Sequence, residues 1–266
     1  ANFETQDPDK ANFDIAVSEF ETAEYMGMTG LAMINASSAY ARGATGAGVT
    51  VGVVDSGVYE EHIEFETNTG DKISIAGSDY ASDDARSNDA ISHGTLVAGV
   101  IAANRDNSND ANINMHGVAY EADISTWEIP LGSGDGPYQP LEENYLTVDQ
   151  DMFFAQRFNA MADVADIINL SFGFSGVVTS FSRDSISDAL SNTLESLRQN
   201  NKSAQDRSIF VVAAGNAFDN LTESGDLVDA DSPELVPGLP YLFPELQNHM
   251  LAVVAVDRSG EIATYS

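Results

Sequence analysis

The chain alternates between short, continuously apolar runs and longer stretches with helical apolar spacing. Helices are predicted over 92–104, about 141–164 and about 180–201. The apolar runs are rich in β-branched residues and too continuous to be half exposed, which is typical of buried parallel strands. They are GVTVGVVDSGV (48–58), ADISTWEI (122–129), DIINLSFG (166–173), RSIFVVAAGN (207–216) and MLAVVAV (250–256). Strands that alternate with helices predict an α/β fold with a mainly parallel sheet flanked by helices.

The segments outside this alternation divide the chain. Residues 1–24 are polar and are expected to form a surface arm or a short helix. GLAMINASSAYARGATG (30–46) has helical spacing and ends in a glycine-rich turn, so it predicts one helix followed by a stop. Residues 217–248 are rich in proline, glycine and acids and are expected to be irregular. With no repeat or linker, we expect an N-terminal arm and lead-in helix (1–44) and one large domain (45–266).

Charge and cysteine content narrow the possible partners. The 266 residues include 11 Lys+Arg and 42 Asp+Glu, a net charge of −31, which repels nucleic acid and anionic membranes. A solvated acidic surface explains this charge, although cations and cationic ligands would also be favoured. The chain contains no cysteine, so disulfides, thiol nucleophiles and cysteine–zinc sites are excluded. Neither an 18-residue apolar run nor a leader pattern is present, which leaves a cytoplasmic protein or one whose signal peptide has been removed.

Three polar residues, Asp55, Ser171 and Asn216, lie at the carboxyl ends of predicted strands. In open α/β sheets, ligands bind outside these ends. The pattern therefore predicts that three polar groups line one edge of the sheet.

A histidine opens the small-residue helix in SHGTLVAGVIAA (92–103). The helix N-terminus disfavours the protonated form of His93, and small side chains let the helix press against a sheet. A general base needs such rigid placement, with a carboxylate on its other ring nitrogen, and Asp55 is a natural partner. By itself, a histidine at a helix start such as His93 is more often a helix cap or a packed surface residue than a catalytic base.

Five segments in this order resemble the subtilisin-like serine proteases, the subtilases: VGVVDSGV, SHGTLVAGVIAA, GVAYEADI, NLSFG and VVAAGN. The resemblance covers roughly residues 45–266, and GLAMINASSAYARGATGAGVTV resembles the mature start of subtilases carried by bacterial autotransporters. It implies a doubly wound α/β fold and a secreted or cell-surface serine endopeptidase. Asp55 and His93 match the triad aspartate and histidine, and Asn216 matches the asparagine that stabilises the oxyanion.

The resemblance also implies a substrate-binding site. Ser171, Phe172 and Gly173 match the extended segment that pairs with substrate and borders the pocket for the residue before the cut. Leu131 and Gly132, in PLGSGDG (130–136), resemble the opposite pairing edge. A peptide would lie between the two edges as an added strand.

The catalytic serine of this family has no counterpart in the chain, because no Gly-Thr-Ser-Met-Ala-like segment is present. Ser56 and Ser92 are better explained as turn and cap residues. The last residues, VVAVDRSGEIATYS, resemble the strand and turn that precede the serine segment. We therefore expect a companion C-terminal segment that supplies the serine and covers an otherwise exposed apolar face. The alternative is a pseudoprotease fragment that binds peptides without cutting them.

Metal binding is the remaining question. His62, His116 and His249 are expected to be structural, since their spacing matches no zinc site. Subtilases commonly bind calcium, and the acidic loop SDYASDDARSND (78–89) offers oxygen ligands, although it could equally be a solvated loop. Calcium is thus the one cofactor expected, with unassigned ligands.

Overall fold

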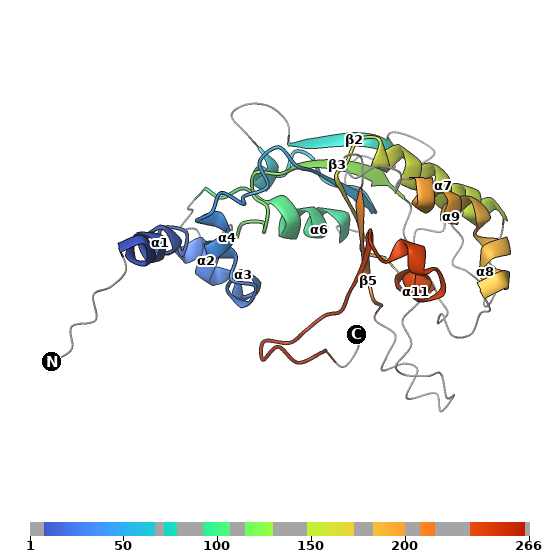
Figure 1. Cartoon of the computed structure of the whole chain (residues 1–266). Helices are drawn as coiled ribbons and strands as arrows, with labels where there is room; N and C mark the ends of the chain where they lie inside the picture. The colour runs from blue at the N-terminus through green and yellow to red at the C-terminus, as the bar shows by residue number, and fades with distance from the viewer. Residues whose placement is uncertain are drawn as a thin grey trace. The chain divides into compact units, whose positions relative to one another are not determined.

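The computed structural model describes residues 8–66, 72–78, 93–106, 115–129, 148–172, 183–199, 208–215 and 235–263 (Figure 1). The helices are α1 (Pro8–Ser18), α2 (Ala23–Gly27), α3 (Thr29–Met33), α4 (Ala36–Tyr40), α6 (His93–Ala102), α7 (Val148–Ala162), α8 (Arg183–Ala189), α9 (Ser191–Gln199) and α11 (Leu235–Leu242), with 3₁₀ turns η1 (Ile63–Phe65) and η3 (Pro244–Leu246). The strands are β1 (Thr50–Asp55), β2 (Ile73–Ser78), β3 (Asp123–Glu128), β4 (Ile167–Leu170), β5 (Ile209–Ala213) and β6 (Met250–Val253). None of the described helices is both long and apolar enough to cross a membrane.

The chain divides into two compact units. The first comprises Ala1–Val49, Glu60–Lys72 and Leu96–Asp123, and the second comprises Thr50–Tyr59, Ile73–Thr95 and Ile124–Ser266. Helix α6 begins in the second unit and continues in the first.

The second unit is built on a six-stranded sheet of order β2-β3-β1-β4-β5-β6. The pairs β2–β3, β1–β4, β4–β5 and β5–β6 are all parallel. The chain starts in the middle at β1, fills one side with β2 and β3, and then fills the other side with β4, β5 and β6. This arrangement confirms the predicted α/β fold, with the strand order reversing beside β1, where ligand sites of such sheets form.

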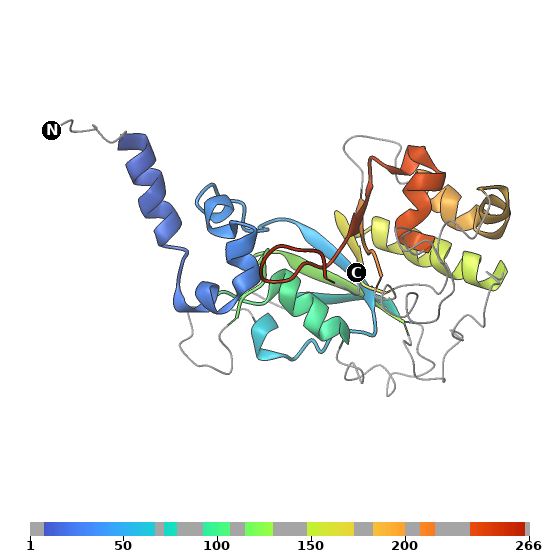
Figure 2. The same ribbon diagram turned by 90° about the horizontal axis from the view of Figure 1, so that it is seen from below.

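Helices α7, α9 and α11 cover one face of this sheet, and Figures 1 and 2 show them gathered on the same side. Alternate strand residues point into the core that these helices close; Phe210 and Val212 of β5, for example, are both fully buried. Phe158 of α7 packs edge-on against Phe210, with ring centroids 5.4 Å apart. Apolar burial on this face is what holds the second unit together.

The opposite sheet face differs along its width. At β5 and β6 its apolar side chains are open to solvent: Ile209 is 40 % exposed, Leu251 55 % and Val253 50 %. At β1 and β3 the corresponding side chains are buried. A continuous apolar strand predicts burial on both faces, and in the described residues β5 and β6 achieve it on only one.

The first unit contains a cluster of aromatic rings around a buried histidine. The rings of Tyr25, Tyr40 and Tyr120 lie 5.4–6.2 Å, centroid to centroid, from that of His116. The Tyr40 hydroxyl donates a hydrogen bond to the carbonyl of Val118 at 2.8 Å. Helices α2 and α4 are thereby held to the segment that precedes β3.

Several predicted elements differ in detail. The single helix expected at 30–46 is two short helices, α3 and α4, because Asn35 between them is left-handed (φ 56°). The helix expected over 180–201 is divided into α8 and α9. The segment 217–248, expected to be irregular, contains α11 and η3 in its described part, and strand β2 was not predicted. The helices expected at 92–104 and 141–164 correspond to α6 and α7.

Candidate active site

The site begins at the carboxyl end of β1, the strand that enters the interior of the second unit. Val53 and Val54 are buried, and Asp55, which ends the strand, is 0 % exposed. The Asp55 carbonyl accepts a hydrogen bond from the Ile129 amide at 2.7 Å, just beyond β3. The backbone of Asp55 is therefore fixed by the neighbouring strand.

Helix α6 brings His93 to this carboxylate. His93 is the first residue of the helix, and its Nδ1 lies 2.8 Å from Asp55 Oδ1. The His93 side chain is 45 % exposed, whereas the aspartate is fully buried. Since Nδ1 is engaged with the carboxylate, Nε2 is the ring nitrogen left to exchange a proton with a reactant.

The turn after β1 locks the two elements together. The Ser56 amide donates to Asp55 Oδ1 at 2.7 Å, and the Gly94 amide donates to Ser56 Oγ at 3.0 Å. Thr95 Oγ1 accepts a further hydrogen bond from the Tyr59 amide at 2.8 Å. Ser56 therefore acts as the turn and cap residue that the sequence predicts.

Two glycines allow the close approach of the turn and the helix. A Cβ on Gly94 would lie 2.0 Å from the Gly57 carbonyl oxygen and 3.1 Å from Asp55 Cβ. Gly57 itself has φ +106°, a conformation that side chains disfavour. Only glycine fits at these positions, so Ser56–Gly57 and His93–Gly94 pack in direct contact. We call these four residues the turn–helix contact.

Burial and hydrogen bonding act in opposite directions on the aspartate. Removal from water raises the pKa of Asp55 above its usual value, and the hydrogen bonds from His93 and the Ser56 amide partly offset that rise. A buried carboxylate held this way orients the imidazole ring beside it. The pair can fix a tautomer, accept a proton at Nε2 and stabilise the resulting charge.

The other predicted site residues are only partly described. Ser171 and Phe172 follow β4; Ser171 Oγ accepts a hydrogen bond from Asn169 Nδ2 at 2.8 Å, and the Phe172 ring stacks on Phe154 with centroids 6.3 Å apart. The Phe172 side chain thus belongs to the core edge, which leaves its backbone as the group that could pair with a peptide. The remaining predicted residues lie outside the described ranges: Asn216, Gly173, Leu131, Gly132 and Ser92.

The structure gives the other histidines structural surroundings. His62 Nδ1 accepts a hydrogen bond from the Glu64 amide at 3.3 Å and so caps η1. His116 was expected to cap the entry to β3, but it is fully buried in the aromatic cluster, its Nδ1 lies 2.8 Å from the Gly117 carbonyl, and burial lowers its pKa. His249, just before β6, is 2 % exposed.

No metal site is seen in the described part of the chain, where no three histidine or carboxylate groups are placed to hold an ion. The acidic loop at 78–89 lies outside the described ranges except for Ser78. Calcium binding therefore stays a prediction.

One buried carboxylate near the site was not predicted. Glu128 is the last residue of β3 and is 1 % exposed. The signal was present in the sequence as a charged residue inside the otherwise apolar run ADISTWEI. Its position next to the turn after β1 depends on the strand order, which the run itself does not reveal.

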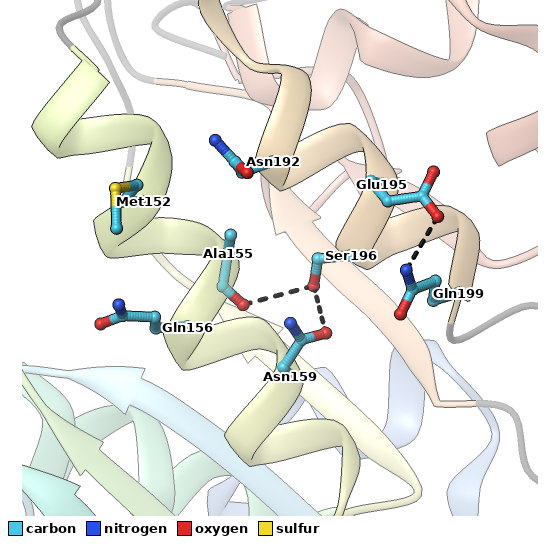
Figure 3. A pocket seen from close by; sticks show the side chains of 8 residues that line it. All are labelled: Met152, Ala155, Gln156, Asn159, Asn192, Glu195, Ser196 and Gln199. Atoms are coloured by element: carbon cyan, nitrogen blue, oxygen red, sulfur yellow. Dashed lines mark hydrogen bonds between the residues drawn. The ribbon is translucent and has the colours of Figure 1, made fainter.

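A groove of about 310 Å³ between α7 and α9 offers a contrast (Figure 3). Ser196 Oγ lies 2.7 Å from Asn159 Oδ1, and Gln199 Nε2 donates to Glu195 at 2.8 Å. No histidine is among the residues that line it. The Ser196 hydroxyl donates to Asn159 and to the Ala155 carbonyl rather than to the Glu195 carboxylate, so the candidate active site remains the Asp55–His93 pair.

Comparison with known proteins gives a family match. The subtilase family model matches residues 46–266. An extracellular serine protease of Serratia marcescens is 27 % identical over 283 residues; the match covers 98 % of this chain and 24 % of the relative.

Solved structures share the fold. MycP1 from the ESX-1 type VII secretion system superposes with a TM-score of 0.61 at 18 % identity, covering 89 % of this chain and 60 % of MycP1. The nisin leader peptidase NisP of Lactococcus lactis gives 0.51 at 21 % identity, covering 85 % and 61 %. With the family match spanning most of its length, the chain belongs to the subtilase family.

Proposed function

We propose that this chain carries the Asp–His half of the catalytic triad of a secreted serine endopeptidase. The observation that supports the proposal most strongly is the 2.8 Å contact between Asp55 Oδ1 and His93 Nδ1, which leaves Nε2 available at a half-exposed ring. Membership of the subtilase family supplies the reaction class. The chain spans about a quarter of the length of the Serratia marcescens relative, which is an extracellular serine protease.

In the proposed reaction, His93 Nε2 takes the proton of a serine hydroxyl as the serine oxygen attacks the peptide carbonyl. The tetrahedral intermediate collapses when the same nitrogen returns the proton to the leaving amine, and water then repeats the sequence on the acyl-enzyme. Asp55 keeps the proton on Nδ1 and stabilises the imidazolium. The Asn216 amide and the backbone N–H of the serine hold the oxyanion.

The substrate is proposed to be an extended peptide. Backbone groups of Ser171, Phe172 and Gly173 would pair with one side of it, and Leu131 and Gly132 with the other. Main-chain pairing fixes the scissile bond without selecting side chains, so specificity would come from the pocket bordering Phe172 and Gly173.

The nucleophilic serine is proposed to come from a companion segment, either a continuation of the chain or a piece separated by nicking. The open half of the sheet supports this, because Ile209, Leu251 and Val253 present adjacent apolar side chains to solvent on β5 and β6. Soluble proteins rarely leave such a surface uncovered. A helix packed there would bury these side chains on the sheet face that also carries Asp55.

A mixed peptide library tests the proposal directly. The whole secreted protein should cleave library peptides, and His93→Ala should cut none at the same enzyme concentration. Val164→Ala, at an exposed position after α7, is the matched control and should cut normally. Retention of peptides without cleavage by the wild-type protein would instead indicate a peptide-binding module.

A further inference from the structure

A second buried carboxylate lies against the turn that carries Asp55. If Gly57 bore a Cβ, that atom would lie 3.2 Å from Glu128 Oε1 and 3.4 Å from its Cγ. The same glycine uses its carbonyl to contact Gly94, the residue after His93. A continuous path of van der Waals contact therefore runs from the Glu128 carboxylate through the turn to the start of α6.

Strand alternation directs Glu128 to the side of the sheet that carries the site. Its neighbour Trp127 packs against the α7 core, where Arg157 lies over the ring at 5.6 Å from the centroid. Thr126, two residues before Glu128, donates its hydroxyl to the Val53 carbonyl at 3.1 Å. Glu128 is thus on the face opposite the α7 core, as Asp55 is, one strand away in the sheet.

We propose that Glu128 is a positioning residue of the active site: its carboxylate supports the turn at Gly57 and, when ionised, stabilises the imidazolium form of His93. The inference rests on the function proposed above. A negative charge in a buried site is weakly screened, so it favours the protonated state of a nearby imidazole by roughly half to one pKa unit.

The turn after β1 also carries Glu60 and Glu61, which are exposed and therefore more strongly screened than Glu128. Asp55 on β1 faces the imidazole directly, and the described residues of α6 after His93 include no charged side chain. On β2, the residue paired with Glu128 is Ser78, which is neutral. A second carboxylate, from the adjacent strand β3, therefore contacts the turn that joins Asp55 to the start of α6.

The test is the pH profile of kcat/KM for Glu128→Gln in the whole protein. Removing the charge should lower the pKa of His93, so the acid limb should shift to lower pH by about half to one unit. Because an imidazolium forms in the transition state, kcat should fall about 3- to 10-fold with KM nearly unchanged. Glu128→Asp, which keeps the charge, should retain the wild-type acid limb.

Asp123→Asn is the matched control, since Asp123 is an exposed carboxylate at the other end of β3, and it should leave the profile unchanged. A folded Glu128→Gln protein with the wild-type acid limb would overturn the proposal. So would a variant that fails to fold, because Glu128 would then serve the fold alone.

A readout without turnover separates this inference from the proposed function. Titration of the His93 ring by NMR should show the lower pKa in Glu128→Gln even if the wild-type protein cleaves no peptide. Absence of cleavage with the shift present would refute the endopeptidase and leave the role of Glu128 intact. An unchanged ring pKa in an active enzyme would refute the role of Glu128 and leave the endopeptidase proposal intact.

Discussion

At the β1 end of the sheet, the face that carries Asp55 is closed, whereas at the β6 end the same face is open. Asp55, Thr126 and Glu128 are at most 1 % exposed. Leu251 and Val253 are each about half exposed, although their strand is just as apolar in sequence. On the opposite face, residues of β1 and of β6 both belong to the buried core that includes residues of α7, α9 and α11.

This difference separates the part of the sheet face that is already packed from the part whose apolar side chains are still exposed in the described residues. The closed half holds an aspartate and a histidine at hydrogen-bond distance. The contact that positions them requires glycine at 57 and 94. The open half has the surface on which a further element would pack. The predictions below test whether the closed half is catalytic and whether the open half is covered in the whole protein.

The largest effect is expected at the closed half, from Asp55→Asn. The asparagine amide would donate to His93 Nδ1 and hold the ring in the tautomer that cannot accept a proton at Nε2. We expect kcat to fall on the order of 10⁴-fold, with the melting temperature unchanged or raised because a buried charge is removed. Steady-state kinetics and thermal melting measure both.

Asp166→Asn is the control for that variant. Asp166 is exposed and accepts a hydrogen bond from the Thr50 amide at 3.0 Å, at the opposite end of β1, and asparagine can keep this bond. Its activity should equal that of the wild-type protein. An Asp55→Asn enzyme with more than a tenth of wild-type kcat would contradict the assigned role.

The next effect concerns the contact between the turn after β1 and the start of α6. Gly94→Ala would place a methyl group 2.0 Å from the Gly57 carbonyl and push the start of α6 away from β1. Because a displacement of about 1 Å can cost about 10²-fold in rate, we expect a loss of that order, with destabilisation of about 1–3 kcal/mol. Gly43→Ala provides a comparison, because a Cβ there meets nothing within 4 Å, so any cost should come from its positive φ alone and leave activity intact. Equal activity losses in Gly94→Ala and Gly43→Ala would argue against a specific requirement for close packing at Gly94.

A third substitution probes the open half. Leu251→Asp should destabilise the whole protein by about 2–4 kcal/mol if another segment covers β6, and should change little if the face stays exposed. Val164→Asp, at a site 49 % exposed after α7, is the matched control and should be near neutral. Chemical denaturation of the two variants measures the difference. Similar denaturation midpoints would show that the β6 face is uncovered in the whole protein.

The smallest effect lies in the first unit, where a buried carboxylate has no catalytic partner. Burial, with the nearby Asp106 and Glu24 charges, raises the pKa of Glu64 to about 7, and Lys72 partly offsets this. A raised folded-state pKa means that the stability contributed by Glu64 is full below about pH 4.5 and is lost as pH rises through 7.

Glu64→Gln should therefore remove a pH-dependent loss of as much as about 3 kcal/mol, and its stability advantage over the wild-type protein should grow from pH 4.5 to 7. Melting curves across this range measure the trend. Glu66→Gln, at an exposed position nearby in sequence, should show no such trend. A Glu64→Gln advantage that is constant with pH would contradict the raised pKa.

The sequence could predict the parts of this molecule that depend on local pattern. Five of the six strands were readable because each is a continuous β-branched run, and Asp55 and His93 were readable because each marks the end or start of such an element. Strand β2 was missed because ISIAGS is not a continuous apolar run: it contains two serines and Gly77, which accommodates the ring of Trp127. Tertiary contact, rather than propensity, makes it a strand.

Other features depended on packing that a pattern cannot show. Helix α11 forms in a segment with proline and glycine because Val236, Leu239 and Phe243 share one buried face. Glu128 became a candidate only when the sheet order placed β3 beside β1. The hydrogen bond between Asp55 and His93 could be expected from the sequence, but the glycine contacts that enforce it could not.

The most direct test of the central claim is covalent labelling of the whole protein with a serine-reactive phosphonate, followed by mass mapping of the modified residue. The account predicts one labelled serine outside residues 1–266, with labelling abolished in His93→Ala and preserved in Val164→Ala. Labelling that is equally fast without His93, or that maps to a serine within this chain, would contradict it.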